Sequence, residues 1–162
     1  MQDLIAQELA GTFKAVPFGV AFIRILAAIL LAGLIGAERE WRSKPAGLRT
    51  HMLVSLAACL YVTVGRELVA VDFGGQEALM RFDPLHLIEA VTAGVAFLVA
   101  GIIITSGGKV ENVTTGASLW LAGAIGLACG AGLIPLAALA TLAVLIVLGA
   151  LTLVVRQDDA AD

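Results

Sequence analysis

Residues 115–155 read TGASLWLAGAIGLACGAGLIPLAALATLAVLIVLGALTLVV and contain no charged side chain. A single helix of about 40 residues would be about 60 Å long, twice the thickness of the hydrocarbon core of a bilayer. Gly130, Gly132 and Pro135 interrupt the run near its middle with residues that favour a turn. We therefore expect two membrane spans here, at about 115–133 and 135–155.

The composition of the whole chain agrees with this interpretation. The chain has 162 residues, of which 60% are hydrophobic and 14% charged, and its mean hydropathy is +0.99. Soluble domains are about 25% charged, and disordered or nucleic-acid-binding chains are more polar or more basic than this one. The composition therefore excludes these classes, nucleic-acid partners included. It predicts an all-α integral membrane protein that folds as a bundle of about five transmembrane helices.

Three further spans precede the uncharged run, at about 18–37, 48–65 and 85–105. With the two above they form a single membrane domain over residues 1–162. The SGGK turn at Ser106–Lys109 lies between two β-branched stretches and favours a small hairpin there.

The two ends of the chain differ in character from the spans. Residues 1–16 place most of their apolar side chains on one side of a helix, which predicts an amphipathic segment at the membrane interface. A cleaved signal peptide is the alternative for this segment. Residues 156–162 form a short acidic tail.

The distribution of basic residues predicts the orientation, because cytoplasmic loops carry an excess of lysine and arginine. With five spans, one side of the membrane holds Arg39, Arg42, Lys44, Arg49, Lys109 and Arg156. The other side holds only Lys14, Arg66 and Arg81. We therefore expect the N-terminus outside and the C-terminus in the cytoplasm.

Small residues at helical spacing indicate how the spans pack, because they let helix backbones approach closely in lipid. They are Ala32 and Gly36 in the first span and Ala122, Gly126 and Gly130 in the fourth. The spacing leaves open whether the partner helix belongs to the same chain. The two cysteines, Cys59 and Cys129, lie in apolar runs and are interpreted as small core residues.

Three stretches of the sequence resemble the bacterial MgtC/SapB family. The longest runs from Arg24 to Ser55, RILAAILLAGLIGAEREWRSKPAGLRTHMLVS, where an arginine opens the helix and a glycine-rich half leads into ERE, a basic turn and PAGLRTH. The others are DPLHLIEAVTAGVAFLVAG and VTTGASLWLAGAIGLACGAG, the latter with Thr114, Thr115 and Trp120 at family positions. The resemblance covers nearly all of the chain from Arg24 onward.

The resemblance implies a multi-pass protein of the bacterial inner membrane. Longer members carry a soluble C-terminal domain, so we expect a short member of the family. The founding member is linked to magnesium-limited growth and to virulence, through survival inside host cells. It is regarded as a modulator of other membrane proteins, including the ATP synthase. The resemblance thus implies such a partner besides the lipid bilayer.

Arg24 and Glu89 are single ionisable residues within otherwise apolar spans, at similar depths from the outer end. Such residues are costly in a membrane and usually face the bundle interior in pairs or beside water. We expect an ion pair between them. Independent snorkelling to the headgroups and a transport pathway are the alternatives.

The loop between the first two spans has the densest charge in the chain. Glu38 and Arg42 are spaced i, i+4 and pair if the first helix continues beyond the membrane. The alternative is that the charges only anchor the topology and contact lipid phosphates. We take as the candidate cytoplasmic motif Glu38, Arg39, Glu40, Arg42, Pro45, Gly47, Arg49, Thr50 and His51.

Two functions compete on these observations. The first is modulation of another membrane protein through helix–helix contacts, and the second is transport of Mg²⁺ or another cation by a small oligomeric carrier or channel. We expect no enzyme, because no nucleophile–base set appears. We also expect no cofactor and no metal site, since His51 and His86 lie on opposite membrane faces.

Overall fold

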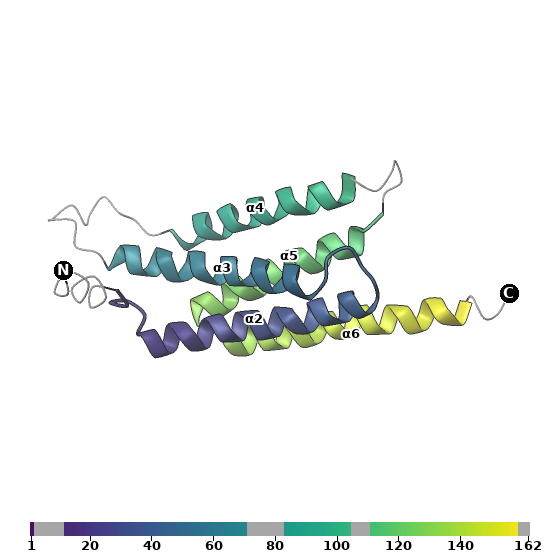
Figure 1. Cartoon of the computed structure of the whole chain (residues 1–162), viewed down its shortest axis with the longest axis horizontal. Coiled ribbons are helices and arrows are strands. Elements are labelled where there is room, and N and C mark those ends of the chain that lie inside the picture. The colour runs from purple at the N-terminus through teal and green to yellow at the C-terminus, as the bar shows by residue number, and fades with distance from the viewer. Residues whose placement is uncertain (2–11, 71–82, 105–110, 159–162) are drawn as a thin grey trace.

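The computed structural model describes residues 1, 12–70, 83–104 and 111–158, which form five helices (Figure 1). Their bounds are α2 Phe18–Trp41, α3 Leu48–Val69, α4 Pro84–Ile104, α5 Val113–Ala131 and α6 Ile134–Asp158. The described part of the chain contains no strand. Four of the helices, α2 to α5, are long and apolar enough to cross a membrane, and the described apolar stretch of α6 is Ile134–Gly149. The chain is thus an all-α, multi-pass membrane bundle.

The helices lie side by side along one axis, with α5 at the centre. In α5, 56% of the most apolar window is buried, against 17% in α4, so α5 is the core helix and α4 is peripheral. The helix α5 packs against all four others, and α2 packs against α3, α5 and α6. Figure 1 accordingly shows α4 on one side of the α3–α5 layer and α2 with α6 on the other. Among the described residues, α2 and α4 make no contact.

Small residues allow α3 to pack closely against α5 and α2. A Cβ on Gly130 would lie 2.7 Å from the carbonyl oxygen of Cys59, and one on Gly126 would collide with the carbonyl oxygen of Ser55. On the other side, a Cβ on Gly36 would lie 2.7 Å from the Cα of Leu48. The side chains of Ala32, Ala122 and both cysteines are fully buried in the same core. These small residues therefore serve packing within the chain.

The helix bounds lie within a few residues of the predicted spans, with two differences. The first helix continues beyond residue 37 to Trp41, so that it carries the ERE charges on helical backbone. The predicted hairpin near residue 106 is wrong, because Ile102–Ile104 end α4 and Val113 begins α5. Apart from its ends, a helix pairs all of its own backbone groups, whereas a short hairpin leaves its edges unpaired in lipid. Residues 2–11 of the predicted amphipathic segment lie outside the described residues.

Candidate functional site at the α2–α3 junction

Residues 38–51 join α2 to α3 in a turn fixed by backbone hydrogen bonds, which we call the α2–α3 junction. The amide of Lys44 donates to the carbonyl of Arg39 (3.0 Å) and that of Ser43 to Glu40 (2.9 Å), around Ser43 in the left-handed region at φ 54°. This is the bond pattern of a Schellman turn, which ends the helix sharply. The junction therefore has a defined course.

Glu40 and Gly47 fix the start of α3. Glu40 accepts a hydrogen bond through Oε2 from the amide of Leu48 (2.8 Å), which satisfies an N–H that the helix itself leaves free. A Cβ on Gly47 would lie 2.7 Å from the same oxygen, so a larger residue there would displace the carboxylate from this contact. The glycine of the PAGLRTH stretch thus permits the capping contact.

Three charged residues at the end of α2 form a cluster, and it is largely buried. Glu38 makes the expected i, i+4 ion pair with Arg42 and lies 3.7 Å from an Nη atom of Arg39. Only 4% of Arg39 is exposed, and its Nη2 donates to the Thr115 hydroxyl on α5 (3.3 Å). A cation this deeply buried is stable only with such partners. Arg39 therefore ties the end of α2 to the start of α5.

His51 makes a parallel link between α3 and α5. Its Nδ1 is 2.8 Å from the carbonyl oxygen of Gly47, and its Nε2 is 3.0 Å from the Ser118 hydroxyl, which is also 2.8 Å from the carbonyl oxygen of Thr115. A carbonyl only accepts, so Nδ1 carries a proton. If the ring is neutral, Nε2 carries no proton and can only accept a hydrogen bond. The Ser118 hydroxyl has a single proton, which it donates either to Nε2 or to the carbonyl of Thr115. The orientation of this hydroxyl and the protonation of His51 are thus linked.

Three further motif residues, together with the neighbouring Trp41 and Lys44, are exposed around this buried network. We call the exposed rim the set Trp41, Lys44, Pro45, Arg49 and Thr50, whose members are all exposed. Trp41 is 87% exposed. The junction thus consists of a buried network of hydrogen bonds and ion pairs and of the exposed rim.

At the start of α5 the three residues at family positions have different environments. Thr115 is buried in the network, whereas Thr114 and Trp120 are exposed. The residue that precedes the helix, Asn112, makes no side-chain capping hydrogen bond. Within the described residues, no group of three or more His, Cys, Asp or Glu is placed to hold a metal ion.

The structure does not bring Arg24 and Glu89 together. Arg24 donates through Nη1 to the carbonyl of Gly130 (2.9 Å), whereas the Glu89 side chain is 74% exposed, with an oxygen 3.8 Å from Nδ1 of His86. The expected ion pair is wrong because equal depth does not make two helices neighbours, and α3 and α5 lie between α2 and α4. The Arg24 side chain turns instead to the backbone of α5.

Sequence reasoning missed three residues with structural roles. Ser118 completes the His51 link, and its spacing of i, i+3 from Thr115 was the available signal. Arg66 donates to the carbonyl of Ala131 (3.4 Å). Glu67 accepts hydrogen bonds from the amides of residues 14–16 (2.8–3.2 Å). The partners of Arg66 and Glu67 are backbone groups, which every residue type has, so the sequence does not reveal these contacts.

Comparisons with known proteins identify the family. The model of the MgtC family matches residues 25–157. Protein MgtC of Brucella abortus (strain 2308) is 42% identical over 120 residues, which cover 74% of this chain and 46% of that protein. Protein MgtC of Salmonella typhimurium (strain 14028s / SGSC 2262) is 37% identical over 123 residues, covering 76% of this chain and 48% of that one.

A third relative carries a different name. "Putative magnesium transporter YhiD" of Escherichia coli (strain K12) is 33% identical over 130 residues, covering 78% of this chain and 58% of that protein. No solved structure matches the chain. The chain spans about half the length of the curated relatives it matches. Since the family model and these relatives cover most of the bundle, the chain belongs to the MgtC family.

Proposed function

We propose that this chain is an inner-membrane protein of magnesium homeostasis that modulates another membrane protein by direct contact. The exposed rim of the α2–α3 junction is the contact surface, and it lies on the cytoplasmic side. Membership of the MgtC family supports the general role, and the name of the Escherichia coli relative connects that protein with magnesium. The proposal assigns the chain no catalytic step.

The observation that carries the proposal is the division of the junction into buried and exposed charges. Arg39 and His51 are buried and form hydrogen bonds with Thr115 and Ser118 of α5, respectively. Arg49, in contrast, is exposed. A loop that only sets the orientation of the protein needs an excess of basic residues on this side of the membrane. It does not need those residues to be held in a fixed spatial arrangement. A buried network beneath the turn keeps the exposed rim in one arrangement.

The composition of the exposed rim also suits contact with a protein. Tryptophan and arginine are the residue types most enriched at the energetic centres of interfaces. Trp41 and Arg49 are both exposed on this preordered turn. Because the turn is already fixed, little conformational entropy is lost when a partner binds.

A complementation experiment tests the proposal. Cells that lack the chromosomal copy receive the full chain with Arg49→Gln and are grown at limiting Mg²⁺. We expect growth to fall while the abundance of the protein in the membrane stays at the wild-type level, since Arg49 is exposed. Lys14→Gln removes an exposed basic residue at the opposite end and should complement fully. Full complementation by Arg49→Gln together with Trp41→Ala would exclude the exposed rim as the contact surface.

Transport of Mg²⁺ is the second candidate function. The name of the Escherichia coli relative favours it. The two candidates differ in whether this chain alone moves the ion across a bilayer, which liposomes containing the purified chain measure directly.

A further inference from the structure

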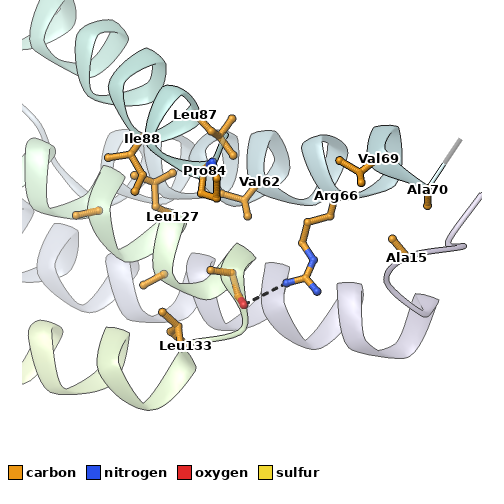
Figure 2. Close-up of a pocket in the computed structure, with 13 residues that line it drawn as sticks. Ala15, Val62, Arg66, Val69, Ala70, Pro84, Leu87, Ile88, Leu127 and Leu133 are labelled. Atoms are coloured by element: carbon orange, nitrogen blue, oxygen red, sulfur yellow. Dashed lines mark hydrogen bonds between the residues drawn. The ribbon is translucent and has the colours of Figure 1, made fainter. Parts of the chain in front are cut away.

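A partly open recess of about 720 Å³ lies at the end of the bundle opposite the α2–α3 junction (Figure 2). Helices α3, α4 and α5 form its walls, which are lined mainly by Val62, Val69, Leu87, Ile88, Leu127 and Leu133. Its volume lies within the range of about 300–1,000 Å³ that is typical of small-molecule sites. Figure 2 shows the Arg66 side chain extending from α3 among these apolar groups toward the end of α5.

The end of α5 explains why an arginine points into an apolar recess. The last four carbonyls of a helix have no partner within it. Here the amides of Leu133 and Gly132 donate to Ala128 and Cys129, 2.8 and 2.9 Å away, and end the helix in a turn. Two arginines serve the remaining carbonyls: Arg24 donates to Gly130 and Arg66 to Ala131. Figure 1 shows this turn set back from the adjacent ends of α2 and α3.

Within the described part of the chain, this arrangement leaves two positive charges without a carboxylate partner. The C-terminal end of a helix carries about half of a negative elementary charge, whereas the two guanidinium groups carry two positive charges. Among the described residues, neither Arg24 nor Arg66 makes an ion pair with a carboxylate. The neighbouring Glu67 is engaged by the three amides of residues 14–16. A ligand with negative charge would therefore be stabilised here.

We propose that the recess binds an anionic phospholipid, with its phosphate on Arg66 and an acyl chain along the apolar walls. Arg66 uses only Nη1 in a contact of 3.4 Å, so most of its five N–H donors are available to phosphate oxygens. Arg24 contributes a second positive charge on the adjacent carbonyl. A free phosphate would make no use of the apolar walls, and an uncharged lipid would leave both guanidinium charges unbalanced.

Lipid dependence of thermal unfolding tests the site. The purified full chain is reconstituted in nanodiscs of phosphatidylcholine alone or with added phosphatidylglycerol. We expect phosphatidylglycerol to raise the Tm of the wild-type chain and to remain bound in native mass spectrometry. Arg66→Gln should lose this increment in Tm and weaken lipid retention by about tenfold, the loss typical of one charge-assisted contact. Lys44→Gln, a charge removal at the opposite end, should keep both.

A second variant separates the site from a general effect of charge on folding. Ala124 is an exposed residue of α5 that lines the recess, and Ala124→Phe fills part of it while leaving both arginines in place. We expect this variant to lose the retention of phosphatidylglycerol as well. The proposal would be overturned if the Tm of the wild-type chain were the same with and without phosphatidylglycerol. It would also be overturned if Lys44→Gln lost the increase in Tm as Arg66→Gln does, or if inorganic phosphate alone raised the Tm.

Discussion

At the scale of single residues, the structure depends on a few positions where only one residue type fits. Gly132 ends α5 at φ +89°, and a Cβ there would lie 2.7 Å from Nη2 of Arg24. Glycine adopts this left-handed conformation without steric cost, whereas other residues lose about 1–2 kcal/mol. The turn that positions both arginines thus depends on this one residue.

We therefore expect Gly132→Ala to lower the free energy of unfolding in detergent by about 2 kcal/mol, from backbone strain and displacement of Arg24. Gly94→Ala is the matched control, since Gly94 lies within α4 and a Cβ added there would have no neighbouring atom within 4 Å. That variant should be neutral or stabilising by up to about 1 kcal/mol. Equal effects of the two substitutions on unfolding would contradict this account of the turn.

At the scale of helices, side-chain links across the bundle determine which elements act together. Arg39 and Thr115 join α2 to α5 through a buried hydrogen bond, whereas Arg24 and Glu89 lie on helices that do not touch. Residues in contact show coupled effects on stability of about 0.5–3 kcal/mol, and distant residues add within about 0.5 kcal/mol.

Two double-mutant cycles measured by unfolding in detergent distinguish these cases. Arg39→Gln with Thr115→Val should destabilise less than the sum of the single variants, because each removes the same hydrogen bond. Arg24→Gln with Glu89→Gln should be additive. Coupling between Arg24 and Glu89 would support the ion pair expected from the sequence. Additive effects of Arg39→Gln and Thr115→Val would contradict the hydrogen-bonded link between α2 and α5.

How far the sequence predicts the molecule also depends on the interaction concerned. The span positions follow from hydropathy, and the Glu38–Arg42 pair follows from helical spacing, since both are local. The lateral order of the helices is not local, so the equal depth of Arg24 and Glu89 suggested a contact that the bundle does not make. The partners of Arg24 and Arg66 are backbone carbonyls, which no residue type reveals.

At the scale of the whole molecule, the orientation of the bundle decides which surface meets the cytoplasm. The positive-inside distribution predicts that the exposed rim is cytoplasmic. A cysteine at Lys44 should therefore react with an impermeant reagent only after cells are permeabilised, and one at Asp83 should react in intact cells, since both positions are exposed. The native cysteines are fully buried and give little background. The opposite labelling pattern would invert the proposed topology.

We propose that the chain acts by contact and does not itself carry Mg²⁺. Uptake of Mg²⁺ into liposomes that contain only the purified chain tests this most directly, with an Mg²⁺ ionophore in parallel liposomes as the positive control. We expect uptake no faster than in protein-free liposomes, while the same preparation unfolds cooperatively and is therefore folded. Saturable uptake above that background would show that the chain itself carries Mg²⁺ and would exclude action by contact alone.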